Sequence, residues 1–276
     1  MYHIVFNADD NYIKYMVVLI TSIIKNANSQ SNATNILHLE QKNQKEKFVF
    51  HVLTDFISTD NMRKTIEFCK ELDKIYPCEI NFYKIDQNIF ENENLSRYRG
   101  NYSTYYRLKL GSYLPKKIKK CIYLDIDILV LSDIRELFNF DLQGKILGAS
   151  FILHPWVEPL KPLNSKDDFF ELKSTYFNSG VLLIDLEKWR EEEIEKKCLQ
   201  FMKKYYIRNP PDEVILNAIF GVDITNLPLS WNFLLGFLFN SATFFNESNQ
   251  IKACFSKHYL NHHAKCIKIL HYTLNI

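Results

Sequence analysis

Glycine is scarce in this chain, with 7 residues among 276. Neither the dinucleotide-binding pattern G-x-G-x-x-G nor the phosphate-binding pattern G-x-x-x-x-G-K-[ST] occurs. Both patterns use glycine to bring backbone N–H groups close to a phosphate. The sequence therefore excludes the two common glycine-rich phosphate sites. A nucleotide bound here would need another means of holding its phosphates, and a metal ion is the obvious alternative.

The chain also lacks C-x-x-C pairs and long apolar runs. Its six cysteines are scattered, and several lie in apolar segments, which predicts a reduced, intracellular protein with buried thiols. The longest apolar run, residues 16–20, is far too short to span a bilayer. The first residues read as a strand rather than as a signal peptide. We therefore expect a cytoplasmic protein.

Net charge is small, at +2. A value this low does not indicate nucleic-acid binding by bulk electrostatics, so we expect no nucleic-acid partner. Lysines do cluster at two places, and these are Lys116, Lys117, Lys119 and Lys120, then Lys196, Lys197, Lys203 and Lys204. Such clusters are most often solvated faces. The alternative is peripheral contact with an anionic surface, such as the inner face of the cytoplasmic membrane.

The hydrophobic pattern alternates short apolar segments with amphipathic ones. We expect strands at 4–6, 48–53, 79–85, 121–130, 146–151, 176–184 and 267–271, and helices at 12–26, 59–75, 103–113, 186–206 and 210–220. Polar or proline-containing loops are expected at 28–47 and 153–174. The initial β-α-β-α-β order predicts an α/β protein with a parallel sheet and helices on its faces.

The strand predicted at 121–130 carries two carboxylates, Asp125 and Asp127. Residues two apart in an extended chain share one face, so both side chains can turn to one point. Two buried carboxylates side by side are costly unless a cation neutralises them, and Mg²⁺ or Mn²⁺ prefers oxygen ligands. The pair therefore suggests a metal-dependent nucleotide-sugar site, although Asp-x-Asp alone is a weak signal.

Other polar residues fall where predicted strands end. Asp9 and Asn11 follow the first strand, and Asn178 interrupts a later one. Ligands of parallel α/β sheets bind outside the carboxyl ends of the strands. Because packing of the core does not require polar residues there, these positions indicate a site at that edge.

A second histidine-rich group offers a competing metal site. His258, His262, His263 and Cys266 lie close together in the sequence. A tetrahedral zinc site would need further ligands with suitable spacing, and no second cysteine pair is present. We expect these residues to be ordinary surface or core side chains.

Several separated motifs together resemble glycosyltransferase family 8, the retaining group that includes bacterial lipopolysaccharide galactosyltransferases and glucosyltransferases and also glycogenin. The motifs are collinear from residue 3 to residue 272. They are VFNADDNY at 5–12, YYRL at 105–108, YLDIDILV at 123–130, LGAS at 147–150, YFNSGVLLIDL at 176–186, Trp189, Asp212, Leu216-Asn217, Trp231-Asn232 and His271-Tyr272.

The resemblance implies a GT-A fold, with a mixed, mostly parallel sheet flanked by helices and a Rossmann-like nucleotide-binding half. We expect one domain over residues 1–276. Residues 1–130 would be mainly the nucleotide-binding half, and residues 131–276 mainly the half that holds the donor sugar and the acceptor.

The resemblance also implies Mn²⁺, or Mg²⁺ in its place, and a UDP-sugar donor. The residues it assigns are of three kinds. Asp125, Asp127 and His271 match the metal ligands; Asn7, Ala8, Asp9, Asn11, Tyr12, Arg107 and Ile126 match or adjoin donor-binding positions; and Asn178, Asp212 and Glu213 match positions around the donor sugar. Arg107 could instead simply pair with a carboxylate at the edge of the core.

Glu213 departs from the family pattern, which usually has glutamine after the aspartate at 212. A carboxylate near the anomeric carbon could stabilise an oxocarbenium-like transition state or attack it. It could equally be a neutral substitution.

The C-terminus also departs from the family pattern. In the family, the metal-binding His-Tyr pair is usually followed by a glycine and then by Lys-Pro-Trp, whose lysine binds the diphosphate. Here Leu274 takes the place of the glycine, and the sequence stops at Ile276, where Lys-Pro-Trp would begin. Either the sequence is truncated at this end, or the tail is short and donor binding is weakened.

The resemblance implies a retaining, metal-dependent transferase that moves a hexose, galactose or glucose, from a UDP-sugar to a glycan or glycolipid acceptor such as lipopolysaccharide or lipooligosaccharide. The alternative is a UDP-sugar-binding protein with weak or no transferase activity. A nucleotidyltransferase is disfavoured, because such enzymes usually place a glycine-rich basic loop after the first strand.

Overall fold

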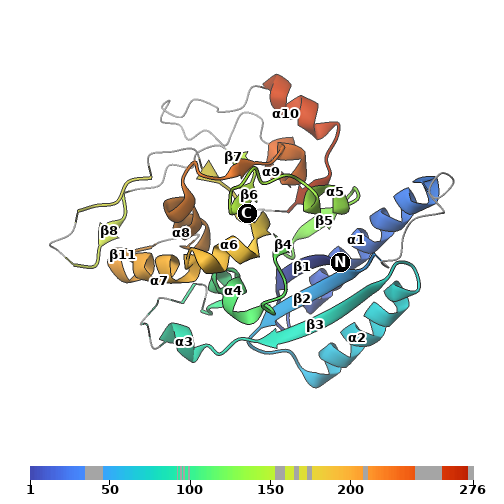
Figure 1. The fold of residues 1–276 in the computed structure, drawn as a ribbon, viewed down its shortest axis with the longest axis horizontal. Coiled ribbons are helices and arrows are strands. Elements are labelled where there is room, and N and C mark those ends of the chain that lie inside the picture. The colour runs from blue at the N-terminus through green and yellow to red at the C-terminus, as the bar shows by residue number, and fades with distance from the viewer. Residues whose placement is uncertain are drawn as a thin grey trace.

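A seven-stranded sheet forms the centre of the protein in the computed structural model (Figure 1). The structure describes residues 1–34, 46–91, 93, 95, 97–98, 100–152, 159–164, 168–172, 176–207, 211–239 and 257–272. The strand order is β12-β6-β10-β4-β1-β2-β3. The strands are β1 (Tyr2–Asn7), β2 (Phe48–Thr54), β3 (Cys78–Lys84), β4 (Lys120–Leu124), β6 (Leu147–Ala149), β10 (Val181–Asp185) and β12 (Thr225–Asn226).

Only one strand of this sheet runs against the others. β10 pairs antiparallel with β4 and with β6, whereas the pairs β1–β2, β2–β3, β1–β4 and β6–β12 are parallel. The predicted mixed, mostly parallel sheet is confirmed. The predicted strand over 176–184 is wrong as one piece, because residues 178–180 turn between β9 (Tyr176–Phe177) and β10. β9 pairs instead with β7 (Phe151–Ile152).

Helices cover both faces of the sheet. On one face lie α1 (Ile13–Thr34), α2 (Thr59–Asp73) and α5 (Arg135–Phe138). On the other lie the 3₁₀ helix η1 (Ser103–Lys109), α4 (Leu110–Tyr113), α6 (Leu186–Glu191), α7 (Ile194–Lys204) and α8 (Pro211–Phe220). This three-layer arrangement places the sheet between two hydrophobic cores, and it is the expected α/β architecture.

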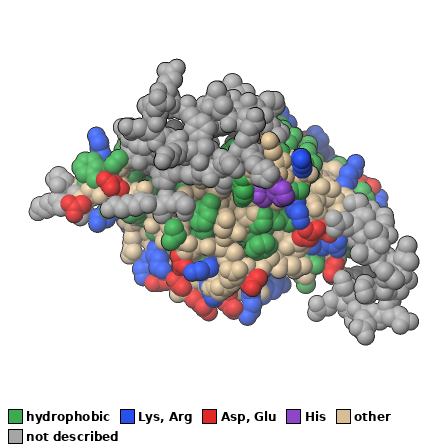
Figure 2. Space-filling model, turned by 90° about the horizontal axis from the view of Figure 1, so that it is seen from above, with side chains coloured by type: hydrophobic (Ala, Val, Ile, Leu, Met, Phe, Trp, Pro, Cys, Tyr) green, Lys and Arg blue, Asp and Glu red, His purple; other side chains and the backbone are tan. Residues whose placement is uncertain are grey.

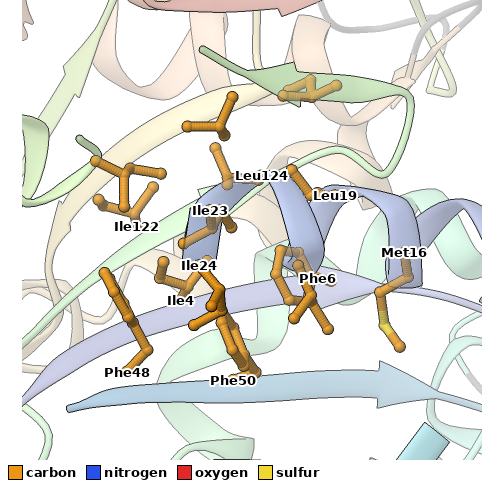
Figure 3. Close-up of a cluster of buried hydrophobic side chains, with 14 of the residues drawn as sticks. Ile4, Phe6, Met16, Leu19, Ile23, Ile24, Phe48, Phe50, Ile122 and Leu124 are labelled. Atoms are coloured by element: carbon orange, nitrogen blue, oxygen red, sulfur yellow. The ribbon is translucent and has the colours of Figure 1, made fainter. Parts of the chain in front are cut away.

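The alternation of β1 shows how the sequence builds both cores. Ile4 and Phe6 face α1, where they pack with Leu19 (Figure 3). Val5 belongs to the core on the opposite face. All of these side chains are fully buried. Burial of each such side chain contributes about 1.5–3 kcal/mol. A central strand buried on both faces needs a continuous apolar run, and β1 has one.

A second, three-stranded sheet joins the C-terminal part of the chain to the centre. Its order is β13 (Phe233–Leu234), β14 (Ile269–His271) and β5 (Ile128–Val130). β14 pairs antiparallel with β5, so that His271 lies opposite Ile128. The next residue extends the contact, because the Tyr272 N–H donates to the Asp127 carbonyl at 2.8 Å. Residues more than 140 positions apart in the sequence are thereby brought together.

Several predicted boundaries change in the structure. α1 continues through residue 34, so the loop predicted from residue 28 is wrong over its first part, and residues 35–45 lie outside the described residues. The segment 103–113 forms η1 and then α4 rather than one helix. The helix predicted over 186–206 divides into α6 and α7, because Glu193 adopts a left-handed conformation with φ of 51°. That conformation cannot continue a right-handed helix.

The proline-rich segment 153–174 was expected to be a loop, and its described part contains a short strand. β8 (Lys161–Pro162) pairs with β11 (Tyr205–Tyr206) after α7. The remaining elements are α3 (Asn88–Glu91), the 3₁₀ helix η2 (Leu229–Trp231), α9 (Gly236–Phe239) and α10 (Lys257–Ala264). Among the described helices, none combines the length and the apolar character that crossing a bilayer requires.

Candidate active site

The polar residues singled out from the sequence gather at one edge of the central sheet. β1 ends at Asn7, and Asp125 follows the last residue of β4. β10 runs in the opposite direction, so the residues before its start, 178–180, reach the same edge. The Asp125 N–H donates to the Gly180 carbonyl at 2.8 Å and joins the two segments. The site therefore lies where ligands of such sheets are expected.

Asp125, Asp127 and His271 come together at this edge. One ligand atom from each lies within 4.8 Å of the others, the only such group of three among the described histidine, cysteine and acidic residues. Nε2 of His271 is 3.3 Å from Oδ1 of Asp127 and 3.9 Å from Oδ2 of Asp125. The expected convergence is present, but its predicted cause is not. Residues 125–127 form a bend between β4 and β5 instead of one extended strand.

This group fits a divalent cation. Two carboxylate oxygens and one imidazole nitrogen suit Mn²⁺, and Mg²⁺ accepts the oxygens. The Asp127 side chain is 53% exposed, so a cation here could take further ligands from a bound molecule. Gly180 closes the other side. A Cβ at this position would lie 2.2 Å from Cε1 of His271 and 2.8 Å from Oδ2 of Asp125, so any larger residue would displace these groups.

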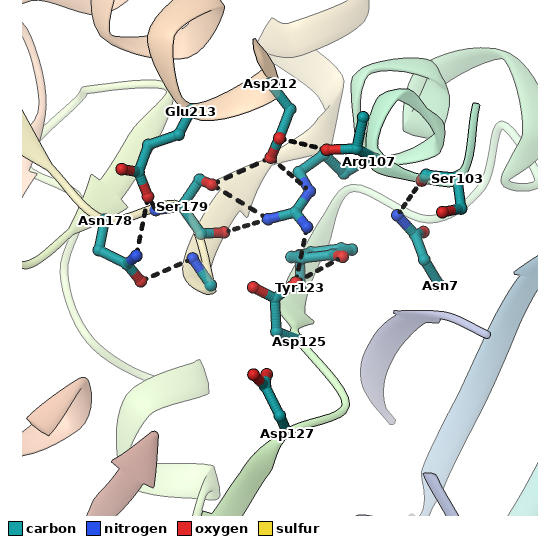
Figure 4. Close-up of polar contacts among 12 residues, drawn as sticks. Asn7, Ser103, Arg107, Tyr123, Asp125, Asp127, Asn178, Ser179, Asp212 and Glu213 are labelled. Atoms are coloured by element: carbon teal, nitrogen blue, oxygen red, sulfur yellow. Dashed lines mark hydrogen bonds and ion pairs between the residues drawn. The ribbon is translucent and has the colours of Figure 1, made fainter. Parts of the chain in front are cut away.

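Arg107 is buried, and its guanidinium lies between the carboxylates of Asp125 and Asp212 (Figure 4). Its guanidinium donates to Oδ1 of Asp125 at 2.6 Å and pairs with Oδ2 of Asp212 at 3.0 Å. It also donates to the carbonyl and the hydroxyl of Ser179 and lies 4.4 Å from the ring centroid of Tyr123. Burial alone would lower the pKa of Arg107, but the two carboxylates raise it above its ordinary value. Arg107 is therefore a charged link between carboxylates.

Asp212 lies in the first turn of α8, and its carboxylate is engaged on both oxygens. Oδ1 accepts from the Thr104 hydroxyl, and Oδ2 accepts from the Ser179 hydroxyl at 3.1 Å and pairs with Arg107. The carboxylate is almost fully buried. These contacts tie α8 to η1 and to the turn before β10. Asp212 is thus placed to hold the site together.

Glu213 lies beside Asp212 and faces a different set of donors. Its Oε2 accepts from Nδ2 of Asn178 at 2.8 Å and from the Ser179 N–H at 3.0 Å. Burial, together with the neighbouring charge of Asp212, raises the pKa of Glu213 to about 7, although the Ser179 N–H acts in the opposite direction. A carboxyl group with this pKa changes its charge near neutral pH.

The segment after β1 forms a turn that leads into α1. Asp9 accepts from the N–H groups of Asn11 and Tyr12 at 2.9 and 3.0 Å, so its carboxylate stabilises the turn that precedes α1. Asn7 donates to the Ser103 carbonyl at 3.0 Å, and its Oδ1 is buried without a partner among the described residues. Tyr12 is 53% exposed. An exposed aromatic ring and an acceptor without a described partner, both in the segment 7–12, are features that suit a planar, hydrogen-bonding ligand.

Two other predicted positions contribute in different ways. Ala8 is buried after β1. Ile126 is half-buried, and its side chain packs against the core on the α1 face. At these positions only the backbone is available to a ligand at the strand ends.

Four residues with polar side chains in this network were not predicted as site residues. They are Thr104, Tyr123, Ser179 and Asn232. Tyr123 donates to Oδ1 of Asp125 at 3.0 Å, and Asn232 contacts both Asn178 and His271. Tyr123, Ser179 and Asn232 lie within the family motifs, and this position in the sequence was the signal that could have identified them as site residues. Their roles depend on which distant residues the fold brings near them.

Several lysines of the two clusters form ion pairs with acidic neighbours. Lys119 pairs with Glu187, and on α7 Lys196 and Lys197 pair with Glu193 and Glu192. Figure 2 likewise shows positive and negative side chains mixed on the visible face. This pattern favours the solvated face that we expected. His262 and His263 lie on α10, and the described residues there do not form a three-ligand group.

Comparison with known proteins identifies relatives of the whole described fold. The model of the family "Glycosyl transferase family 8" matches residues 3–275. Lipopolysaccharide 1,2-glucosyltransferase of Escherichia coli is 26% identical over 72% of this chain and 58% of its own length. Glycosyltransferase GlyB of Streptococcus pneumoniae is 27% identical over 84% of this chain and 48% of its own length. The chain thus spans about half to two thirds of the curated relatives it matches.

A solved structure gives a similar result over a larger share of both proteins. The galactosyltransferase LgtC, in complex with donor and acceptor sugar analogues, superimposes with a TM-score of 0.68. It is 27% identical and covers 99% of this chain and 87% of its own. A second structure of LgtC, an active-site mutant with glutamate in place of glutamine, gives the same values. This similarity agrees with the predicted GT-A fold.

Proposed function

The chain belongs to glycosyltransferase family 8, and we propose that it transfers a hexose, galactose or glucose, from a UDP-sugar with retention of configuration and dependence on Mn²⁺. The observation that carries the proposal is the meeting of Asp125, Asp127 and His271 at the strand ends, beside a buried carboxylate network. The acceptor we propose is a glycan or glycolipid such as lipopolysaccharide or lipooligosaccharide. The lipopolysaccharide glucosyltransferase of Escherichia coli and the structure of LgtC with an acceptor sugar analogue support this substrate class.

Asp125, Asp127 and His271 would hold the cation, with Mg²⁺ as the alternative to Mn²⁺. The cation would supply Lewis-acid stabilisation of the departing UDP diphosphate. Arg107 keeps Asp125 in place through its 2.6 Å bond, and Tyr123 donates to the same oxygen. These contacts leave Oδ2 of Asp125 facing His271.

The turn at 7–12 would hold the uridine. Tyr12 would supply an exposed ring for stacking, and Asn7 would supply an oxygen that has no partner among the described residues. Asp9, which the family resemblance places against the uracil, accepts both turn N–H groups through Oδ1, and among the described residues no hydrogen bond to its Oδ2 is found. The division into a nucleotide half at 1–130 and a sugar and acceptor half at 131–276 stays a prediction. So do a cytoplasmic location and contact with an anionic membrane.

Glu213 would stabilise positive charge that develops at the anomeric carbon. Its carboxylate is buried and is held by Asn178 and Ser179, so its position is fixed before the reaction begins. Asn178, which binds it, would orient it toward the sugar. The ionised form is the active one in this account, and its pKa of about 7 places the change near neutral pH.

We expect the Glu213→Gln variant to lose at least tenfold in turnover at pH 8, about 1.4 kcal/mol in activation free energy. Turnover of the wild type should rise with pH through about 7, whereas that of the variant should lack this step. The titratable groups around Glu213 are Asp212, Arg107 and Tyr176. Initial rates from pH 5.5 to 9 measure both effects. Unchanged turnover and an unchanged pH profile would show that the charge has no role.

The same substitution should stabilise the metal-free protein at alkaline pH. The folded carboxyl has a pKa of about 7 against an ordinary value of 4.5, so folding favours its protonated form. Stability from this group is complete below pH 4.5 and is lost as pH rises through 7, up to roughly 3 kcal/mol. Urea unfolding should show Glu213→Gln more stable than the wild type at pH 8.5 and nearly equal at pH 5. A constant difference at both pH values would contradict the shift.

Retention of anomeric configuration is a further expected outcome. The ground is membership of a retaining family, in which the positions of Asp212 and Glu213 lie around the donor sugar. NMR of the product made from an α-linked UDP-hexose should show a new α linkage. A β-linked product would refute this part of the proposal.

A screen of UDP-sugars for Mn²⁺-dependent UDP release tests the whole proposal. We expect one UDP-hexose to be preferred, with faster release when a glycan acceptor is present. The alternative is a UDP-sugar-binding protein with weak or no transferase activity. Tight UDP-sugar binding without UDP release would favour that alternative, and absence of both would reject the site.

A further inference from the structure

Asn232 lies between His271, one of the candidate metal ligands, and the Asn178–Glu213 pair. It follows η2 and is fully buried. Its Oδ1 is 2.9 Å from Nδ1 of His271, and its Nδ2 donates to Oδ1 of Asn178 at 2.8 Å. Asn178 in turn donates through Nδ2 to Glu213 at 2.8 Å. These three contacts form one continuous chain of hydrogen bonds from His271 to Glu213.

Two backbone N–H groups fix the orientation of the Asn178 amide. The Gly180 N–H donates to Oδ1 of Asn178 at 3.0 Å. The Ser179 N–H donates to the same Glu213 oxygen that Asn178 contacts, at 3.0 Å. A backbone N–H can only donate, and an ionised carboxylate can only accept. Asn178 must therefore turn its oxygen to Gly180 and its NH₂ group to Glu213.

The orientation of Asn178 then determines the next two members of the chain. Because Oδ1 of Asn178 is an acceptor, Asn232 must present its NH₂ group there. The Asn232 oxygen consequently faces Nδ1 of His271. An oxygen acceptor at this point requires a proton on Nδ1. The neutral imidazole therefore has its lone pair on Nε2, which faces Asp127 at 3.3 Å.

We propose that Asn232 is a positioning residue of the metal site, which selects the Nδ1–H tautomer of His271 and so presents the Nε2 lone pair to the cation. The proposal rests on the proposed function, in which His271 is a ligand. Groups that orient a ligating histidine in this way typically change metal affinity by about 10–100-fold. Neither the metal motif nor the sugar motif of the sequence contains Asn232.

The series of hydrogen bonds also couples His271 to Glu213. Each donor in this series points from His271 toward the Glu213 carboxylate. An ionised Glu213 is the stronger acceptor, and hydrogen bonds in series polarise one another. Ionisation of Glu213 therefore makes Nε2 of His271 a better metal ligand. The affinity of His271 for the cation is thereby linked to the ionisation of Glu213 through the side-chain amides of Asn232 and Asn178.

The tautomer can be measured without any metal. ¹⁵N NMR of metal-free protein, at a pH where the His271 ring is neutral, should show the proton on Nδ1. This wild-type measurement does not depend on whether a variant folds. A proton on Nε2 in the wild type would overturn the proposal directly.

Three variants then test the role of Asn232. Asn232→Leu should lose the tautomer preference and bind Mn²⁺ about 10–100-fold more weakly. Asn232→Asp keeps an oxygen facing Nδ1, so it should keep the tautomer. Asn26→Ala is the matched control. The Asn26 side-chain amide donates a hydrogen bond to the Val130 carbonyl of β5, but Asn26 is not part of the series of hydrogen bonds from His271 to Glu213. It should keep both the tautomer and the Mn²⁺ affinity.

The outcomes separate this proposal from the proposed function. Wild-type tautomer and wild-type Mn²⁺ affinity in Asn232→Leu would refute the positioning role. If the tautomer responds as expected but no form binds Mn²⁺, the metal-dependent function fails while the selection of the tautomer stands.

A double-mutant cycle tests the coupling. Glu213→Gln should weaken Mn²⁺ binding several-fold in the wild type and by less in Asn232→Asp, where the link to Asn178 is broken. An equal loss in both backgrounds would show that the charge acts only through space and would reject the coupling.

Discussion

The Asp127→Asn variant is expected to lose at least about a thousandfold in turnover of a UDP-sugar while folding as the wild type does. The amide keeps the shape of the side chain but removes the negative charge that would bind the cation. A bound metal typically supplies several kcal/mol to a departing phosphate, and about 4 kcal/mol corresponds to three orders of magnitude. The Asp127 side chain is 53% exposed, and an asparagine side chain has nearly the same volume, so the substitution opens no cavity in the core.

Initial rates with saturating Mn²⁺, together with thermal unfolding, measure the two parts of this result. Asp60→Asn is a suitable control, because Asp60 has a similar exposure of 56% but lies on α2 among surface ion pairs. The control should keep wild-type turnover. Full activity of Asp127→Asn, or undiminished turnover of the wild type in EDTA, would be incompatible with a metal at this site.

Loss of Arg107 should produce the largest change in stability. Its guanidinium is buried between Asp125 and Asp212, at 2.6 and 3.0 Å. Arg107→Met keeps much of the apolar volume but leaves two carboxylates facing each other without a cation. Removal of one partner from a buried ion pair commonly costs about 3–5 kcal/mol. For a chain of this size we expect the midpoint of thermal unfolding to fall by roughly 10 °C.

Arg63→Met provides the matched control for that measurement. Arg63 also contacts two carboxylates, Asp60 and Glu67, but its side chain is 58% exposed on α2. Exposed ion pairs contribute about 0–1 kcal/mol, so the control should shift the midpoint by no more than a few degrees. Calorimetry of the metal-free proteins compares the two variants. Equal shifts would mean that Arg107 does not act as a buried countercharge.

The order of the elements could be predicted from the sequence because their patterns are local. The apolar run of β1 and the carboxylates after β4 each follow from a few neighbouring residues. The reversed direction of β10 could not be predicted in that way. It depends on pairing with both β4 and β6, which are far apart in the sequence. Propensity likewise did not reveal the break at Glu193, where one residue takes a left-handed conformation.

The site shows the same distinction between local and distant information. Asp125 and Asp127 were expected to converge by strand alternation, but a bend and the register of β14 bring them to His271. The partners of Arg107 and the position of Asn232 depend on contacts between segments more than 50 residues apart or from different elements. A sequence pattern identifies which groups can do chemistry. Only the fold decides which of them share hydrogen bonds.

Equilibrium binding of UDP with and without Mn²⁺ tests the central claim most directly, because a chain without glycine-rich phosphate loops would need the cation to hold a diphosphate. Titration calorimetry of the wild type should show one Mn²⁺ bound per chain in the presence of UDP and UDP affinity at least about tenfold higher with Mn²⁺ than in EDTA, about 1.4 kcal/mol. Asp127→Asn should lose this dependence. UDP binding of equal strength with and without the metal would contradict the account.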